Sequence, residues 1–501
     1  MYQQIRRTTL EEKNRFSRLL EFLINTAQIK NYVLAQELQY DVSYISKWVN
    51  GKLIPSEKTE KKVLSGISHC ISHSSTQEGL YRLLEYYQVS DATELEMAVY
   101  DNLTTEYHYE REQQTDSGSG SGERICFFAD LPMEKYISKM QHPVLRRVNS
   151  LDIMASMDLM SMKHEYRLQI ITLDATPSNS IVIYPNVHFS LVIHVDTEQW
   201  DTIYDTIFLI NMLDKMRHID FSLYGSLHSH GRVIFAVKED FAISGMLVDD
   251  DRCMAVVTTE EKSACSTIYY HIKDLCSREN MLFAACTMKE LLLNNGYIRS
   301  LLVPNPCWIM GHMTEIFLPD DLFTELYWEL HQIQDEVISF EETFRIHEST
   351  KNLLEQAPVR LIFYENTFSD FAISGELDFY NHKVTLTPEQ RVHYMKYLLG
   401  IFNRNENLQI RLLYDKLIAD FHYHSTECVL LSDTLSYLRL GNDGERNKIM
   451  VLNHRNIQTI FMKFFEEVWK INDNIVISDM NFITGYIQHI IQGISSLSPV
   501  S

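Results

Sequence analysis

The stretch KNYVLAQELQYDVSYISKWVNGKLIP, residues 30–55, has the pattern of two short helices joined by a tight turn. Apolar residues recur at helical spacing on both sides of a polar segment at residues 39–41. They are Leu34, Ala35 and Leu38 before the turn, and Val42, Ile45 and Trp48 after it. We expect these six side chains to share one core, with Val42, Ile45 and Trp48 facing inward.

The second helix of this pair has recognisable ends. Ser43 can begin it, as the cap or as a first-turn residue, because a hydroxyl accepts a hydrogen bond from a free backbone N–H. Gly51 tolerates the left-handed conformation at a helix end, and Pro55 prevents continuation.

This order of residues resembles the helix-turn-helix of the Cro and phage-repressor (Xre) family. The matching positions are Leu34-Ala35, Leu38, Val42, Ile45-Ser46, Trp48, Asn50-Gly51-Lys52 and Pro55. Tyr40 stands where the family has a glycine, and Val42-Ser43 stand where it usually has Gln or Thr, which leaves the target sequence open. The resemblance implies a transcription regulator that binds double-stranded DNA.

The outward face of the second helix carries the candidate DNA contacts. Helices docked in this way read base edges with their N-terminal half, which makes Ser43, Tyr44 and Lys47 the base-edge candidates, with Ser46 on the same face. Lys47 can donate to guanine O6 and N7. The helix ends offer phosphate contacts, from Lys30, Asn31, Asn50 and Lys52. The alternative is an ordinary helical pair with solvated polar residues.

The charge distribution favours DNA contact through the N-terminal region alone. Residues 1–75 hold eleven Lys or Arg and seven Asp or Glu, a net charge of 11 − 7 = +4. The remaining residues hold 34 Lys or Arg and 60 Asp or Glu, a net charge of 34 − 60 = −26. We therefore expect phosphate to attract the head and repel the acidic body.

Composition places the chain among folded intracellular proteins. Its 501 residues predict several domains, and a 45% hydrophobic content is typical of a folded protein. We expect a cytoplasmic location without a membrane partner, since no apolar run has the length of a span and residues 1–16 lack the core of a signal peptide. The eight cysteines are scattered without a C-x-x-C pair, which favours reduced core residues.

The chain is predicted to be multidomain, with an all-α helix-turn-helix head and an α/β body. A capping box at Thr9–Glu12 predicts a first helix from Thr9 to about Ala27. The expected domains are a DNA-binding head at 1–72, a helical extension at 73–116 that either enlarges the head or begins a dimer contact, and a flexible Gly/Ser linker at 117–124.

The body contains a repeated hexapeptide. Residues 232–245 read RVIFAVKEDFAISG and residues 360–375 read RLIFYENTFSDFAISG. This identity predicts two copies of one α/β unit, at 125–345 and 346–501, with a ligand cleft between them. Asp240, Ser244, Asp370 and Ser374 are ligand candidates near that cleft. The favoured alternative is a structural turn with buried Phe and Ile and a glycine of unusual backbone angle.

Two H-x-H motifs are the other candidates in the body. His228-Ser-His230 and His422-Tyr-His424 lie on expected strands, where alternate residues share a face and each pair could hold a metal or a phosphate. Twenty histidines make chance pairs common, and no third ligand stands at a fixed spacing. We therefore expect no metal site.

The duplicated unit, with a histidine-bearing strand in each half and a closing aromatic helix, is similar to the phospholipase-D-type fold that some regulators carry as a degenerate effector domain. The H-x-K-x-x-x-x-D motif of its enzymes is missing, because His424 stands in place of lysine and Val429 in place of aspartate. Phosphate loops, dinucleotide fingerprints and hydrolase elbows are also missing from the sequence, so no enzyme activity or cofactor is expected.

The leading hypothesis is a homodimeric regulator of an operator, whose body dimerises or senses a small-molecule or peptide effector. The alternative is an enzyme or defence effector with a DNA-targeting head and an unrecognised site in the cleft. A third hypothesis makes the body an oligomerisation scaffold.

Overall fold

The computed structural model describes residues 14–87, 89, 91–116, 125–146, 150–171, 184–195, 201–301, 303–333, 339–414, 417, 427–440, 449–471 and 475–497. The predicted helix start at Thr9, the linker at 117–124, and His422 and His424 lie outside these residues. The chain divides into two compact units, one holding residues 1–194, 218–221 and 226–279, and the other holding 195–217, 222–225 and 280–501. None of the described helices combines the length and apolar character of a membrane span.

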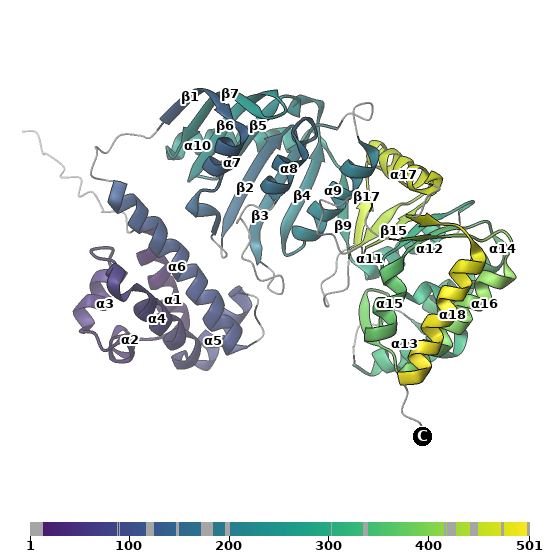
Figure 1. The fold of residues 1–501 in the computed structure, drawn as a ribbon. Helices are drawn as coiled ribbons and strands as arrows, with labels where there is room; N and C mark the ends of the chain where they lie inside the picture. The colour runs from purple at the N-terminus through teal and green to yellow at the C-terminus, as the bar shows by residue number, and fades with distance from the viewer. Residues whose placement is uncertain are drawn as a thin grey trace, which may run out of the picture. The chain divides into compact units, whose positions relative to one another are not determined.

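The N-terminal region is entirely helical over its described residues (Figure 1). Its elements are α1 (Arg15–Ala27), α2 (Asn31–Leu38), α3 (Val42–Val49), the 3-10 turn η1 (Glu57–Thr59), α4 (Glu60–Ser74), α5 (Gln77–Tyr87) and α6 (Ala92–Asp116). Asn14 has an extended backbone and caps α1 by accepting a hydrogen bond from the Ser17 backbone N–H at 2.8 Å. The prediction of one helix from Thr9 to about Ala27 is therefore wrong at its start, because α1 begins at Arg15.

One hydrophobic core joins all six of these helices. It runs from Phe16 of α1 through Leu34 and Trp48 of the predicted helix pair to Tyr107 of α6. The Phe16 and Tyr107 rings pack edge to face, with their centroids 6.1 Å apart. The helices at 73–116 therefore enlarge the head, because they contribute side chains to the same core.

Close helix packing requires a glycine on α5. A Cβ atom at Gly79 would lie 2.7 Å from the carbonyl oxygens of Thr26 and Ala27 at the end of α1. Backbone oxygens cannot move aside as a flexible side chain can, so α5 approaches α1 this closely only without a side chain.

An eight-stranded mixed sheet follows the head. Its strands are β1 (Ile125–Pro132), β2 (Leu151–Met157), β3 (Tyr184–Ile193), β4 (Ile219–Gly225), β5 (Arg232–Val237), β6 (Phe241–Asp249), β7 (Arg252–Thr259) and β8 (Asn280–Met281). Their order is β1-β7-β6-β5-β2-β3-β4-β8, with β2 parallel to β3 and antiparallel to β5. The associated helices are α7 (Met133–Met140), α8 (His164–Ile171) and α10 (Lys262–Cys276). Helix α9 (Thr202–Lys215) belongs to the second compact unit, where it packs on α17 (Arg455–Lys470).

A second eight-stranded mixed sheet occupies the C-terminal region. Its strands are β9 (Phe283–Cys286), β10 (Cys307–Met310), β11 (Arg360–Tyr364), β14 (Gln409–Leu413), β15 (Cys428–Leu431), β16 (Tyr437–Arg439), β17 (Ile449–Leu452) and β18 (Val476–Ile477). The order is β18-β14-β11-β10-β15-β16-β17-β9, and β12 (Glu376–Phe379) and β13 (His382–Thr385) form a separate hairpin. The helices are α11 (Met288–Leu293), α12 (Gly296–Leu301), α13 (Asp320–Ile333), α14 (Phe340–Gln356), α15 (Glu365–Ser374), α16 (Pro388–Arg404), α17 (Arg455–Lys470) and α18 (Met480–Leu497).

The two sheets share one strand order. When the strands of each sheet are numbered one to eight along the chain, without the β12–β13 hairpin, both sheets read 8-4-3-2-5-6-7-1. The second and third strands are parallel in both sheets, and the second and fifth are antiparallel in both. In each sheet, helices connect the two parallel strands, as a crossover connection requires.

The repeated hexapeptide does not occupy equivalent places in this order. Asp240–Gly245 leads into strand β6, whereas Asp370–Gly375 forms the end of helix α15 and its cap. The preceding strands also differ, because β5 is fifth in its sheet and β11 is third. The prediction that the two hexapeptides mark equivalent positions of two repeated units is therefore wrong. Six residues have weak intrinsic preferences, and tertiary contacts decide their conformation.

Candidate nucleic-acid interface

The turn between α2 and α3 is built from three polar residues. Gln39 takes the left-handed conformation (φ 57°), and the Tyr40 backbone N–H donates to the Ala35 carbonyl at 3.0 Å. Asp41 caps α3, and its carboxylate accepts from the Ser43 backbone N–H at 2.8 Å. Hydrogen bonds from the Ser43 side chain and backbone lower the pKa of Asp41 below its usual value. Of the two roles predicted for Ser43, the structure therefore gives it that of a first-turn residue.

The end of α3 matches the sequence prediction. Gly51 has a left-handed φ of 75°, and the Lys52 backbone N–H donates to the Lys47 carbonyl at 2.9 Å. Pro55 is buried, and its carbonyl accepts a hydrogen bond from the Tyr107 hydroxyl at 3.0 Å. Helix α6 thus holds the segment that leaves α3.

Five of the six predicted core residues are buried. Leu34, Ala35, Leu38, Ile45 and Trp48 belong to the core of the head. The prediction that Val42 faces inward is wrong, because 43% of its surface is exposed. Val42 is the first residue of α3, so no preceding helical turn covers it.

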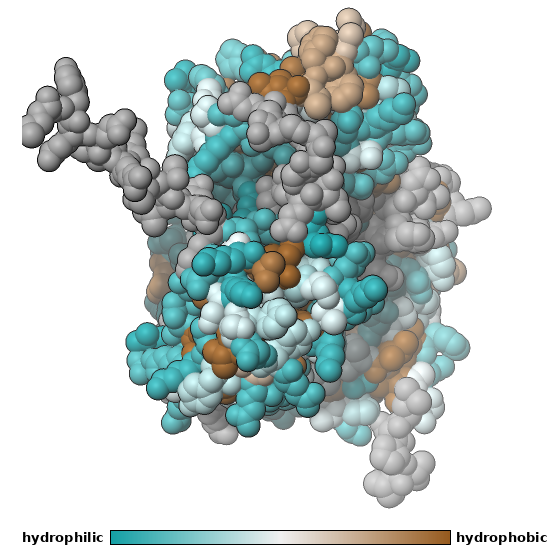
Figure 2. All heavy atoms as spheres, turned by 90° about the vertical axis from the view of Figure 1, so that its left-hand side faces the viewer, coloured by the Kyte–Doolittle hydropathy of each residue, from teal (hydrophilic) through white to brown (hydrophobic). Residues whose placement is uncertain are grey.

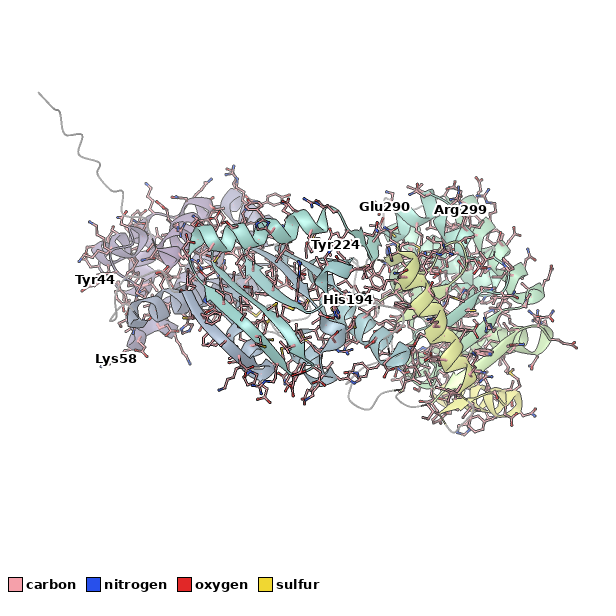
Figure 3. All side chains as sticks on the ribbon, turned by 90° about the horizontal axis from the view of Figure 1, so that it is seen from above. Tyr44, Lys58, His194, Tyr224, Glu290 and Arg299 are labelled. Carbon is pink, nitrogen blue, oxygen red and sulfur yellow. The ribbon has the colours of Figure 1, made fainter. Side chains whose placement is uncertain are left out.

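The predicted DNA contacts form the outer side of the helix pair. Exposed side chains are those of Lys30, Ser43, Tyr44, Lys47, Asn50 and Lys52, while Asn31 and Ser46 are partly buried. Figure 3 places Tyr44 at the outer surface of the head. The Asn50 side-chain amide donates to the Ser46 carbonyl at 2.8 Å, so part of its hydrogen-bonding capacity serves the helix end.

Tyr44 and Lys47 form a pair one turn apart on α3. The Lys47 ammonium lies 5.4 Å from the centre of the Tyr44 ring, within the range of a cation–π contact. The Tyr40 ring meets Tyr44 at 5.9 Å and the buried Trp48 at 5.3 Å. A chain of rings therefore connects the exposed pair to the core of the head and supports Tyr44.

Further exposed lysines follow the helix pair. Lys58 lies in η1, and Lys61 and Lys62 lie in the first turn of α4. Sequence reasoning did not select them, although their closeness to Pro55 and their shared charge were visible. In the lower part of Figure 2 the coloured surface is largely hydrophilic with small separate apolar groups, and a larger apolar group lies at the top of the view.

The four ligand candidates from the repeated hexapeptide occupy positions in which they serve an ion pair, a strand or a helix. The Asp240 carboxylate forms an ion pair with Arg15 of α1, and Ser244 lies within β6, between β5 and β7. Asp370 is exposed on α15, where it accepts from the Asn366 amide at 3.3 Å. The Ser374 hydroxyl donates to the Asp370 carbonyl at 2.8 Å and accepts from the Glu376 backbone N–H at 3.1 Å, which caps the helix end.

The alternative of a structural turn is correct only in part. Phe241 and Phe371 are buried in both copies of the hexapeptide, and Ile243 is buried in the first. Ile373, by contrast, is 78% exposed. Only Gly375 of the two glycines has a left-handed φ, of 71°, and the Arg391 side chain fills the space that a Cβ atom would need.

The first H-x-H motif does not lie on a strand. His228 belongs to the 3-10 turn η4 (Leu227–Ser229), and His230 follows it just before β5, so the two rings do not share the face of a strand. His230 instead contacts the buried Asp158, with 3.1 Å between Nδ1 and Oδ2. The Gly231 backbone N–H donates to the same oxygen at 2.7 Å.

A polar cluster surrounds His230 at the ends of the central strands of the first sheet. Asp158 directly follows β2, and His194 directly follows β3, with its ring 4.8 Å from that of His230. Asp158 Oδ1 and His194 Nδ1 are buried without a hydrogen-bond partner among the described residues. Sequence reasoning missed both residues. The available signal was a polar residue directly after each of two buried strands, where ligands of α/β sheets often bind.

The second sheet contains a buried ionic network instead. Both carboxylate oxygens of Glu315 accept from the Arg439 guanidinium, at 3.2 and 3.1 Å, and Tyr297 donates to one of them. Asp378 lies 3.4 Å from Arg439 Nε and 3.3 Å from His312 Nε2. Burial opposes the ionisation of Asp378, but Arg439 and the hydrogen bond from His312 outweigh it and hold the pKa of Asp378 below its usual value. This network was also missed from the sequence, because its members are far apart in the chain.

No protein-family model matches the chain, and no significant match is found among curated proteins. The geometry of the head and of the two sheets therefore carries the functional interpretation.

Proposed function

We propose that this chain is a sequence-specific DNA-binding transcription regulator whose head inserts α3 into the major groove. The observation that carries the proposal is the exposed Tyr44–Lys47 pair on a short helix that is capped by Asp41 and fixed to the head core by Ile45 and Trp48. A rigid helix with an exposed polar N-terminal half is what base-edge reading requires.

Each exposed residue of α3 has a role in this proposal. Lys47 donates to guanine, Ser43 and Tyr44 contact neighbouring base edges, and the exposed Val42 side chain packs on a thymine methyl group. Ser46 borders this face. Lys30, Asn31, Asn50 and Lys52 contact phosphates at the helix ends, and Lys58 extends the same charged surface.

The proposal includes a homodimer on a two-fold operator. A single head offers few base contacts, whereas two heads double the readout and bring the affinity into the range of specific regulators. Half-sites should then lie about 34–36 Å apart, one helical turn of DNA, or a multiple of it.

Selection from a random double-stranded DNA library with the full chain tests this function. The expected result is an enriched motif with two inverted half-sites at that spacing. Recovery of sequences without a shared motif, with retention that disappears at moderate salt, would contradict sequence-specific binding, since nonspecific affinity alone has this salt dependence.

We also propose that the body arose by duplication of one α/β unit. The shared strand order supports this relation and pairs β1–β8 with β9–β11, β14 and β15–β18. In this register β5 corresponds to β15. The resemblance to a duplicated phospholipase-D-type fold is part of the same proposal.

A sensing role for the body is favoured by the polar cluster at Asp158. A buried carboxylate oxygen without a partner is costly, and a ligand that donates a hydrogen bond to it would remove that cost. A thermal-shift screen of amino- and hydroxyl-bearing metabolites tests this role. A ligand that raises the melting temperature of the chain but not of its Asp158→Asn variant supports it, while ligands that shift both proteins equally, or none, argue against it.

A further inference from the structure

Helices α4 and α6 bring together three side chains that can bind a metal ion. His69 and His73 lie one turn apart on α4, with their rings stacked at a centroid distance of 4.3 Å. Glu96 extends toward them from α6. Among the described residues, these three form the one group of at least three His, Cys, Asp or Glu side chains whose ligand atoms lie mutually close enough for a metal.

The spacing of the ligand atoms suits a tetrahedral ion. Glu96 Oε2 lies 3.2 Å from His69 Nδ1 and 3.5 Å from His73 Nδ1. An ion with metal–nitrogen and metal–oxygen distances of about 2.0–2.2 Å places neighbouring ligand atoms roughly 3.3–3.5 Å apart. The three atoms all lie within 4.8 Å of one another, and the two stacked imidazole rings must rotate to direct both Nδ1 lone pairs at one ion.

The three side chains are accessible from solvent. The exposed fractions are 49% for His69, 45% for His73 and 30% for Glu96. His73 Nδ1 also lies 2.9 Å from the Ser72 hydroxyl and 3.2 Å from the His69 carbonyl, and a metal ion would displace both contacts. The Ser72 hydroxyl has an alternative acceptor in the Ser68 carbonyl at 2.9 Å. A metal ion can thus replace the Ser72 contact without leaving the hydroxyl unsatisfied.

We propose that His69, His73 and Glu96 form a site for a divalent transition metal of the zinc class, with water completing the coordination. Two imidazoles and one carboxylate are a ligand set that Zn²⁺ accepts, and alkaline-earth ions prefer oxygen ligands. The bound ion ties α6 to α4, and α4 also packs on the helix pair, because Gly66 of α4 faces Leu38 of α2. Metal binding therefore stabilises the fold of the head.

A matched pair on the same two helices provides the control. His108 Nε2 of α6 lies 3.0 Å from Glu60 Oε1 of α4, so this pair has the same chemistry but only two ligands. His108→Gln should leave metal binding intact, whereas His69→Gln, His73→Gln and Glu96→Gln should each abolish it. Glu96→His should restore binding, since a third imidazole replaces the carboxylate.

The test uses the full chain, free of affinity tags and stripped of metal with a chelator. Addition of Zn²⁺ should raise the melting temperature of the head saturably, with one more ion bound per chain than in the Glu96→Gln variant. Co²⁺ should give the visible absorption of a tetrahedral site in the unmodified chain and in His108→Gln, but not in His69→Gln. An equal response of Glu96→Gln and the unmodified chain to both metals, or no response at all, would overturn the proposal. DNA binding is measured separately, so failure of the metal site leaves the proposed function untouched.

Discussion

Two exposed tyrosines, one in the head and one in the body, each have a lysine ammonium at a similar distance from the ring. Tyr44 is 46% exposed, with the Lys47 ammonium 5.4 Å from its ring. Tyr270 of α10 is 47% exposed, with the Lys238 ammonium 5.9 Å from its ring. The surroundings differ, because the first pair lies on the outer face of α3 within residues 1–75, whose net charge is +4, and the second lies in the remainder of the chain, whose net charge is −26. A pair of side chains alone does not define a DNA contact; the charge and shape around it do.

Arg439 in the second sheet is a buried cation and contrasts with the exposed Lys47 of the head. Arg439 is fully buried and forms ion pairs with Glu315 and Asp378, whereas Lys47 is exposed to solvent. A cation that the protein has already paired serves stability, and one that faces solvent can meet a phosphate or a base. Substitutions at these positions should therefore affect different measurements.

Arg439→Ala should have the largest effect. It leaves Glu315 and Asp378 buried without their counter-charge, which should lower the free energy of unfolding by about 3–5 kcal/mol. Chemical denaturation measures the loss. Adding Glu315→Gln and Asp378→Asn removes the stranded charges and should recover part of it; if the combined variant were less stable than Arg439→Ala, the ionic account of this network would be wrong.

Acid should remove part of the same stabilisation. The pKa of Asp378 is lowered in the folded state, so its contribution is fully present above the ordinary carboxyl value of 3.8 and is lost as pH falls through the lowered value. Denaturation curves across this pH range should show that Asp378→Asn loses less unfolding free energy with falling pH than the unmodified chain does. Parallel pH profiles of the two proteins would show that Asp378 is not responsible.

Lys47→Ala should weaken specific DNA binding by about 1–3 kcal/mol, roughly 5- to 150-fold in Kd, without changing the melting temperature. Lys238→Ala, from the matched pair in the body, should change neither quantity. Fluorescence anisotropy with the selected operator measures both variants. Equal losses of operator affinity in Lys47→Ala and Lys238→Ala would contradict the assignment of the Tyr44–Lys47 pair as the DNA contact.

Lys52→Ala should have a smaller and less selective effect. Loss of one phosphate contact weakens binding to all DNA sequences alike and reduces the slope of log K against log salt by about 1. Binding isotherms at several salt concentrations, on operator and unrelated DNA, measure this slope. A loss confined to the operator would instead make Lys52 a base contact.

Substitutions of Asp41 should have the smallest effect on DNA binding, and the two variants should differ in their effect on stability. Asp41→Asn keeps an acceptor for the Ser43 backbone N–H and removes a negative charge near phosphate, so DNA binding should tighten slightly at unchanged stability. Asp41→Ala removes the cap and should lower the melting temperature of the head. The cap assignment fails if both variants melt at the same temperature.

The head could be predicted well because its signals are local. Apolar spacing places α2 and α3 correctly, and Gly51 has the expected left-handed conformation. The error at Val42 arises at a helix start, where periodicity does not say whether a neighbouring element covers the residue. The sequence also could not show that α1–α6 share one core, since that depends on which helices pack together.

The body could be predicted only in outline. The sequence predicted an α/β body, and the structure has two mixed sheets with helices. The hexapeptide identity gave the wrong register, because the same six residues lie in a strand between β5 and β7 and at the end of a helix. The cluster of Asp158, His194 and His230 depends on strand neighbours, which a single sequence does not reveal.

Photo-cross-linking tests the central claim most directly. A benzophenone amino acid is placed at Tyr44 or at Tyr270, two sites of nearly equal exposure, and the full chain is irradiated with its selected operator. DNA insertion of α3 predicts strong cross-linking from position 44 to bases within the half-sites, and none from position 270. Equal cross-linking from both positions, or none from position 44 while the operator is bound, would contradict it.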